Sequence, residues 1–163
     1  DTGQFYWPVS FLGIHLLPTI VVFFGCLPLI PIVFSDTPVM WTDFPGFFIA
    51  LSAIEIERRA DNQLRNFKKN NIQTNDLVCD VGLWKYSRHP NYFGEITFWG
   101  GIFIIAYGLN PSENLVYGTG LLSMIILFIF ISIPMMEKRQ MQKESYTAYR
   151  RQVSMLVPWF RKS

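Results

Sequence analysis

The sequence predicts an all-α, polytopic membrane helical bundle with about four transmembrane helices and an amphipathic C-terminal helix on the cytosolic side. Half of the 163 residues are apolar and only 16% are charged, whereas a soluble domain carries about 25% charged residues. Four apolar stretches are also long enough to approach the ~20 residues that a helix needs to cross a bilayer. This composition, with a mean hydropathy of +0.24, excludes a disordered chain and a nucleic-acid-binding module.

The first two apolar stretches cover residues 9–34 and 39–56. Three prolines interrupt the first stretch, at Pro18, Pro28 and Pro31. We expect a kinked helix there, because neighbouring helices can satisfy the carbonyl groups that proline leaves free. The second stretch is predicted to continue as a polar helix that projects from the membrane, since no Pro or Gly intervenes between Gly46 and Lys69.

The third predicted span covers residues 91–109 and ends before Asn110-Pro111, which is a strong stop signal. The fourth covers residues 115–136 and contains no charged residue. A kink is expected at Pro134, followed by a short amphipathic helix in the tail. We place on that helix Met141, Tyr146, Tyr149, Arg150 and Arg151.

The charges predict the orientation in the membrane. All 14 Lys and Arg residues lie within residues 58–88 and 138–162, so the positive-inside rule places Lys69 and Ser163 in the cytosol and Asp36 and Glu113 on the opposite side. Four crossings then put Asp1 in the cytosol as well. Because the chain opens without Met and without a signal peptide, we expect residues 1–163 to be one domain from the C-terminal part of a longer protein.

The sequence predicts no disulfide and no metal site. Cys26 lies in an apolar run and Cys79 in a polar loop, so both are expected to be reduced, and no paired Cys/His spacing is typical of zinc. His15 has no second ligand at i+3 or i+4. We interpret it as hydrogen-bonded to a neighbouring helix.

Acidic residues within or beside the spans are costly and often functional. Asp43 and Glu55 lie at predicted membrane edges, where solvent or basic neighbours can satisfy them, and Asp43 before Pro45 is a candidate helix cap. Glu95 differs because it lies one turn inside the third span, four residues after Asn91. These two side chains share a helical face, and we expect them to point into a cavity.

The polar helix at residues 57–69 carries a charged stripe. Asp61, Arg65 and Lys68 fall at i, i+4 and i+7 on one face, beside an apolar face. Two readings stay open. The stripe can be a solvated face on which Asp61 pairs with Arg65, or Arg65 and Lys68 can hold the phosphates of a nucleotide cofactor, for which fixed cations are suited.

Residues 82–95 form a dense run of aromatic and hydrogen-bonding side chains at the start of the third span. Pro90 fits the first turn of a helix, and Arg88 and His89 sit beside its N-terminus, where unpaired N–H groups favour a phosphate or carboxylate. The alternative is a membrane-surface anchor made of Trp84, Tyr86 and Arg88. The chain has no G-x-G-x-x-G and no P-loop motif, so any nucleotide is bound without a Rossmann or P-loop fold.

These motifs resemble the C-terminal domain of the steroid 5-alpha-reductase family over nearly the whole chain, in particular its uncharacterised bacterial branch. The residues that carry the resemblance are Ala60-Asp61-Asn62-Gln63, Phe67-Lys68, Ser87-Arg88-His89-Pro90-Asn91-Tyr92-Phe93-Gly94-Glu95, Glu137, Tyr146, Tyr149 and Pro158. The Asn-Gln followed by Phe and a basic residue is similar to the sterol C14- and delta-7-reductases. The Arg-His-Pro-x-Tyr element resembles, more distantly, the isoprenylcysteine and phospholipid methyltransferases, which bind S-adenosylmethionine.

The resemblance implies an NADPH pocket that opens to the cytosol between the long loop, the third span and the tail. By motif position, Lys68 would meet the phosphates on the adenosine side of the cofactor. Trp84 would pack near the cofactor, while Asn91 and Tyr92 would hydrogen-bond it.

The resemblance also implies roles for the acidic residues. Asp61 and Glu95 would support the nicotinamide end, and Glu137 and Tyr149 would contact the nucleotide from the tail. Two features depart from the family: Leu64 stands where sterol reductases often place a base, and the spacing from Glu137 to Tyr149 is shorter than theirs. In the steroid 5-alpha-reductases the groups that polarise the substrate enone lie in the N-terminal half, so we expect the catalytic acid to be absent from this chain.

Three hypotheses about function follow. The first is a membrane-embedded reductase that transfers hydride from NADPH to a carbon-carbon double bond of a steroid or other lipid. The second is a methyltransferase that uses S-adenosylmethionine in the same pocket and acts on a lipid or prenyl-cysteine acceptor. The third is a non-catalytic membrane subunit that keeps the motifs by descent. In each case the bilayer is a partner, no nucleic acid is expected, and the sequence leaves substrate and oligomeric state open.

Overall fold

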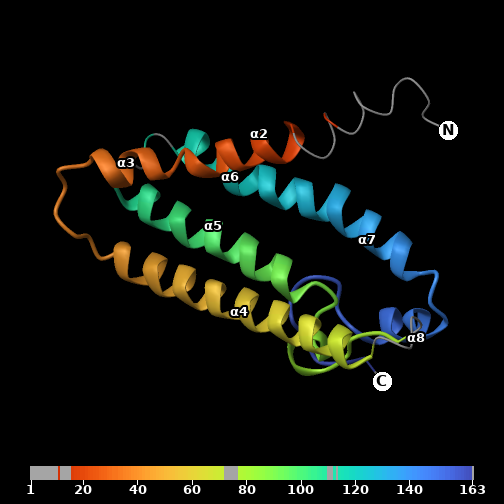
Figure 1. Ribbon diagram of the computed structural model, residues 1–163. Helices are drawn as coiled ribbons and strands as arrows, with labels where there is room; N and C mark the ends of the chain where they lie inside the picture. The colour runs from red at the N-terminus through yellow and green to blue at the C-terminus, as the bar shows by residue number, and fades with distance from the viewer. Residues whose placement is uncertain (1–10, 12–15, 72–76, 110–111, 113, 163) are drawn as a thin grey trace.

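The computed structural model describes residues 11, 16–71, 77–109, 112 and 114–162 (Figure 1). Within these residues every regular element is helical, which confirms the all-α prediction. The α-helices are α2 (Leu17–Cys26), α3 (Leu29–Phe34), α4 (Asp43–Asn70), α5 (Pro90–Leu109), α6 (Asn114–Ile126), α7 (Ile133–Gln140) and α8 (Glu144–Gln152). The predictions for Asp1, His15, Glu113 and Ser163 fall outside the described residues.

Three helical stretches of the described chain are long and apolar enough to cross a membrane: Leu17–Phe34, Pro90–Leu109 and Val116–Gln140. They match the first, third and fourth predicted spans. The second predicted span is the first half of α4, in which the apolar stretch ends at Glu55. There Glu55 pairs with Arg58 and Arg59 on the helix surface, as expected for an acid at a membrane edge.

Proline explains the irregularities of the first and last spans. Pro18 lies in the first turn of α2, and the break between α2 and α3 falls at Leu27 and Pro28. Residues 127–132 form a π-helix that joins α6 to α7, so the helix continues through Pro134, and the kink expected there stays a prediction. Proline removes one hydrogen bond and its ring clashes with the carbonyl four residues earlier, and a π-helical turn relieves that clash.

Helices α4 and α5 lie side by side over most of their length (Figure 1). Small residues allow this close approach, because a Cβ built on Gly101 would lie 2.7 Å from the Gly46 carbonyl oxygen, and one on Gly94 would lie 3.0 Å from the Ala53 carbonyl oxygen. On its other side α5 contacts α6, and α2 packs against α6. The start of α4 differs from our cap prediction, since the Asp43 carboxylate accepts a hydrogen bond from the preceding Met40 N–H at 2.7 Å.

Both basic blocks meet at one end of the bundle. The C-terminal half of α4, the segment before α5, the end of α7 and α8 all lie together there, whereas the connection from α3 to α4 lies at the opposite end (Figure 1). The fold therefore separates the basic connections from the connection that contains Asp36, as the positive-inside rule requires.

We predict that Lys69 faces the cytosol and Asp36 the opposite side. Lys69→Cys and Asp36→Cys chains in intact cells, treated with a membrane-impermeant thiol reagent, should label only at position 36 until the membrane is permeabilised. The parent chain measures background reaction at Cys26 and Cys79. Labelling of position 69 from outside the cell would contradict this orientation.

Candidate functional site

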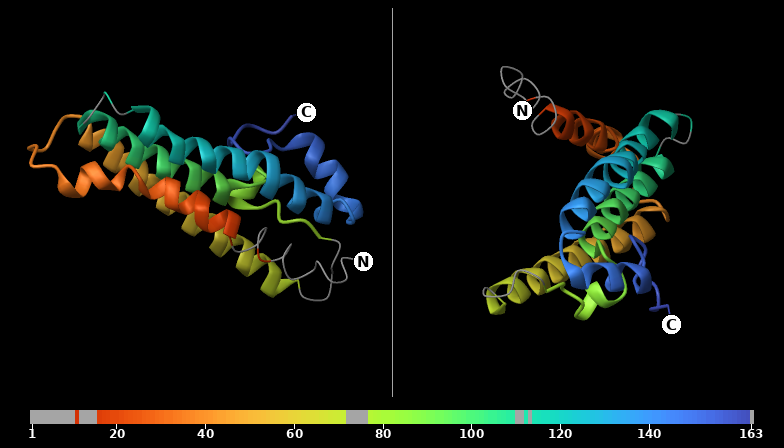
Figure 2. Two further views of the ribbon diagram at one scale, coloured as in Figure 1. Left: turned by 90° about the horizontal axis from the view of Figure 1, so that it is seen from above. Right: turned by 90° about the vertical axis from the view of Figure 1, so that its right-hand side faces the viewer.

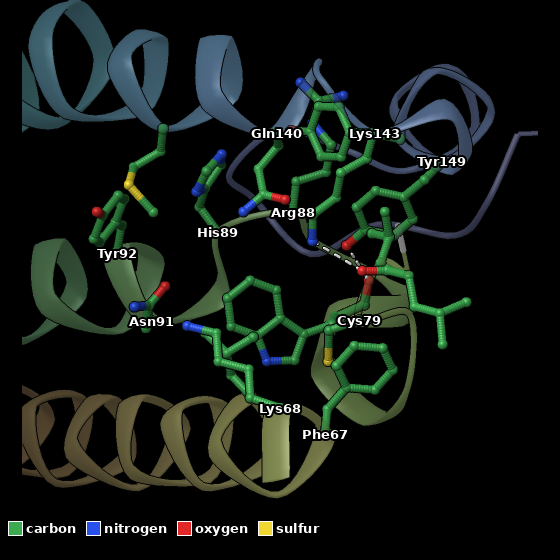
Figure 3. Close-up of a pocket in the computed structure, with 16 residues that line it drawn as sticks. Phe67, Lys68, Cys79, Arg88, His89, Asn91, Tyr92, Gln140, Lys143 and Tyr149 are labelled. Carbon is green, nitrogen blue, oxygen red and sulfur yellow. Dashed lines mark hydrogen bonds between the residues drawn. The ribbon is translucent and has the colours of Figure 1, made fainter. Parts of the chain in front are cut away.

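A cavity of about 120 Å³ lies at the end of the bundle where the basic blocks meet (Figure 3). Its wall combines aromatic rings, aliphatic side chains and three cations from α4, the segment before α5, α5, α7 and α8. The lining residues are Leu64, Phe67, Lys68, Leu77, Val78, Cys79, Trp84, Arg88, His89, Asn91, Tyr92, Met136, Gln140, Lys143, Tyr146 and Tyr149. A cavity of about 150 Å³ holds a benzene ring, so this one is of the order of a single ring.

The short 3-10 helix Gly82–Lys85 is fastened to α4 and places Trp84 in the cavity wall. Gly82 has φ +58°, and a Cβ there would clash with the side chain of Gln63, so glycine is required both by conformation and by space. The Gln63 Oε1 accepts a hydrogen bond from the Leu83 N–H at 2.8 Å, and the Trp84 Nε1–H donates to the Ala60 carbonyl at 2.9 Å. The Tyr149 hydroxyl donates to the Trp84 carbonyl at 2.6 Å, so α8 is attached to the same segment.

A buried ion pair joins the start of α5 to the end of α7. The Arg88 Nε and Nη2 each lie 2.7 Å from the Glu137 Oε1, and the exposed fractions of the two side chains are 9% and 10%. The Arg88 Nη1 donates to the carbonyls of Arg150 and Val153 at 2.7 and 2.9 Å. Arg150 supplies a second cation, with its Nε 3.2 Å from the Glu137 Oε2. The Arg88 guanidinium therefore already has a counter-ion and hydrogen-bond acceptors in Glu137 and the α8 region, although it also borders the cavity.

Two buried polar groups of the cavity wall, the His89 Nε2 and the Tyr146 hydroxyl, make no well-formed hydrogen bond to the described residues, although Glu137 lies near both. The His89 Nε2 lies 3.5 Å from the Glu137 Oε1, too far for a good hydrogen bond. Burial lowers the pKa of His89 to about 4 and raises the pKa of Tyr146 to about 12. At neutral pH the imidazole is uncharged and the phenol keeps its proton, so both can hydrogen-bond a neutral or anionic ligand.

Two lysines approach the cavity from opposite sides. Lys143 lies just before α8 and its Nζ donates to the Leu77 carbonyl at 2.9 Å. Lys68 comes from α4 and is exposed to solvent, and its Nζ points toward Asn91 and has no ion pair or hydrogen bond to a described residue (Figure 3). A cation that borders a cavity and lacks a partner favours an anionic ligand.

The structure brings together most of the predicted cofactor-binding residues. Seven of them line the cavity: Lys68, Trp84, Arg88, His89, Asn91, Tyr92 and Tyr149. Tyr92 stacks between the His89 ring at 5.4 Å and the Phe128 ring at 4.5 Å between centroids. The surface-anchor alternative is wrong for Trp84 and Arg88, because both side chains are buried.

The other four predicted residues, Asp61, Arg65, Glu95 and Glu137, do not line the cavity. Arg65 is exposed on α4, and no ion pair joins it to Asp61 within the described chain. Instead the Asp61 Oδ1 accepts a hydrogen bond from the Asn91 Nδ2 at 3.2 Å. Glu95 is close enough to Asp61 for an electrostatic interaction, so Asn91 connects the cavity with these acidic residues.

Sequence reasoning missed several lining residues. Cys79, expected in a polar loop, is only 6% exposed and borders the cavity, and its pKa is raised by burial. Sequence reasoning also missed Gln140, at the end of α7, and Lys143, just before α8, because no sequence pattern indicates that these two side chains face α4. Both cysteines are free, as expected, and the described residues contain no group of three or more His, Cys, Asp or Glu that could hold a metal ion.

Comparison with protein families found one match. The model that matches residues 1–153 is described as "Protein of unknown function (DUF1295)". The chain belongs to the DUF1295 family. Comparison with curated proteins found no match, and comparison with solved structures found none either.

We predict that Glu137→Gln lowers the free energy of unfolding by ~3 kcal/mol, because it leaves the buried Arg88 charge without a carboxylate. Chemical unfolding of the detergent-solubilised DUF1295 chain measures this change. Glu55→Gln is the matched control, since its pairs with Arg58 and Arg59 are on the surface and should contribute less. An equal decrease in the free energy of unfolding in the two variants would show that the buried pair of Arg88 and Glu137 stabilises the chain no more than a surface ion pair does.

The buried His89 predicts acid sensitivity. Its pKa is lowered from 6.5 to about 4 in the folded chain, so the unfolded state binds more protons between these values. Stability is therefore complete above pH 6.5 and falls as the pH drops toward 4, by ~3 kcal/mol if no other group compensates. Unfolding of the parent and of His89→Gln across this range isolates the contribution, and parallel curves would contradict it.

Proposed function

We propose that this chain is the cofactor-binding part of a membrane-embedded reductase that transfers hydride from NADPH to a carbon-carbon double bond of a steroid or other lipid. The observation that carries the proposal is the ring-sized cavity, in which Lys68 has no partner while His89 and Tyr146 keep unpaired polar atoms. The motifs that resemble the steroid 5-alpha-reductases surround this cavity.

The donor set fits one end of a phosphate-bearing nucleotide. Trp84 and Tyr149 offer aromatic surface to a flat heterocycle, whereas the Tyr92 ring is already stacked between His89 and Phe128. Lys68 and Lys143 border the same space and can neutralise phosphate oxygens. Because the cavity is only about 120 Å³, one ring would enter it and the rest of the dinucleotide would extend along the basic surface outside.

NADPH, when bound, supplies the hydride, and the residues of this chain orient it. Arg88 contributes indirectly, since its pairing with Glu137 and with the α8 carbonyls keeps the wall closed. Asn91 lines the cavity and donates a hydrogen bond to Asp61. An amide group of the bound cofactor that hydrogen-bonds Asn91 would thereby be connected to the acidic residues.

The location of the cavity supports a lipid as the second substrate. Tyr92 and Asn91 lie in the first turn of α5, which is long and apolar enough to span a bilayer. Tyr92 also packs against Phe128 of the π-helix in the last span. A hydrophobic molecule that enters from the membrane would meet the cofactor end of α5 at this boundary.

The S-adenosylmethionine hypothesis predicts a different ligand charge. That cofactor is a sulfonium cation, and a wall with Lys68, Lys143 and Arg88 opposes a positive charge. Titration of the detergent-purified chain with NADPH and, separately, with S-adenosylmethionine distinguishes the hypotheses. Saturable NADPH binding supports the reductase, binding of S-adenosylmethionine alone would replace it with the methyltransferase, and no binding of either would favour a non-catalytic subunit.

We predict that Lys68→Ala weakens NADPH binding by about 1.5–3 kcal/mol, the range of a hydrogen bond to a charged group. Lys69→Ala is the matched control, because Lys69 neighbours Lys68 on α4 and is exposed but does not line the cavity. Calorimetric titration of both variants measures the difference. If Lys68 is only a solvated charge, the two variants will bind NADPH equally.

A further inference from the structure

An aromatic cluster lies exposed beside the start of α5. The exposed fractions of Tyr86, Trp159 and Phe160 are 39%, 67% and 78%. The Phe160 ring lies 6.4 Å from the Tyr86 ring and 6.4 Å from the Trp159 ring, each in an edge-to-face arrangement. Rings that gather on one surface while remaining this exposed mark an interaction surface.

Backbone hydrogen bonds hold this cluster in place. The Trp159 N–H donates to the Tyr86 carbonyl at 2.9 Å, and the Arg88 N–H donates to the Ser154 carbonyl at 2.8 Å. The Ser87 hydroxyl donates to the Leu156 carbonyl at 2.7 Å. The terminal segment is therefore fixed along residues 86–88 and does not depend on its own helical structure. The short amphipathic helix expected in the tail is α8, and no helix follows Gln152 in the described residues.

The position of the cluster is that of a membrane boundary. Tyr86 precedes Pro90, the first residue of a candidate span, by four residues. After α8 the chain turns back alongside the bundle instead of continuing away from it (Figure 2). Aromatic side chains concentrate at this level of membrane proteins, where a ring can sit among the lipid headgroups.

Basic residues surround the rings. Arg161 pairs with Asp80 at 3.0 Å and donates to the Lys85 carbonyl at 3.4 Å. Lys85 and Lys162 are exposed, and neither side chain makes an ion pair with a described residue. An acidic protein surface and an anionic leaflet both attract such charges, but only the leaflet is already adjacent to the start of α5 in a chain of this kind.

We infer that Lys85, Tyr86, Trp159, Phe160 and Lys162 form a membrane-docking rim that inserts its rings among the headgroups of an anionic leaflet beside the bundle. This inference is independent of the proposed function. Backbone hydrogen bonds attach the rim to residues 86–88, and Arg88 of this segment lines the cavity. Docking would therefore hold the terminal segment against residues 86–88, next to Arg88 of the cavity wall.

A fluorescent probe on the full chain in vesicles tests the rim without removing any of its residues. Val157 is 56% exposed in the same segment, so Val157→Cys carries an environment-sensitive label beside the rings. Gln142→Cys is the control, because Gln142 is exposed in the turn between α7 and α8, which lies at the same end of the bundle as the rim but beyond α8 and away from α5 (Figure 1). The parent chain, labelled in the same way, corrects for reaction at Cys26 and Cys79.

In vesicles that mix phosphatidylcholine and phosphatidylserine, the probe at position 157 should be quenched by lipids that carry a spin label near the headgroup, and the probe at 142 should not. A lysine near an anionic leaflet is worth ~1 kcal/mol, so Lys85→Gln and Lys162→Gln should each weaken docking about fivefold. In vesicles of phosphatidylcholine alone, docking of the parent chain should be weakened at least as much as it is by either lysine substitution.

Three results would overturn the inference. Equal quenching at positions 157 and 142 would show that the rim does not touch the bilayer. Quenching that is unchanged in phosphatidylcholine alone and in both lysine variants would remove the anionic leaflet as the partner. Protection of the probe that rises with the protein-to-lipid ratio would show that a second copy of the chain covers the rim.

Discussion

The buried guanidinium of Arg88 is the constraint on which the cavity end of this bundle depends. A charge in that position is costly unless a counter-ion and hydrogen-bond acceptors surround it. Glu137 supplies the counter-ion and the carbonyls of Arg150 and Val153 supply the acceptors. Because the counter-ion comes from α7 and the two carbonyls come from α8 and the residue just after it, the Arg88 charge before α5 is satisfied only when these elements are assembled.

That assembly separates two kinds of cation. Arg88 is fully used by the fold, whereas Lys68 borders the same cavity without a partner. His89 and Tyr146 show the same contrast, since both are buried yet keep an unpaired polar atom in the wall. Buried polar groups are ordinarily hydrogen-bonded, so these groups indicate where a ligand would complete the structure.

The close packing of α4 on α5 determines the position of the acidic residues. Gly94 brings α5 against the backbone of α4 at Ala53 and Glu57, and this proximity lets Asn91 reach Asp61. Burial and the nearby Asp61 raise the pKa of Glu57. The acidic residues thus form a polar layer between the two helices, and Asn91 is the side chain that belongs to both this layer and the cavity.

Local properties of the sequence determined the helices, the membrane class and the clustering of basic residues at one end, because hydropathy, proline and charge act over a few neighbouring residues. The motif resemblance predicted a common pocket for Lys68, Trp84, Asn91 and Tyr92, and these residues do line one cavity. The resemblance could not decide which charges remain available for a ligand. Arg88 and Glu137 are far apart in the chain and each looked suited to a cofactor, yet tertiary packing buries them against each other. A side chain's partner depends on which elements meet in space, and only the assembled bundle decides that.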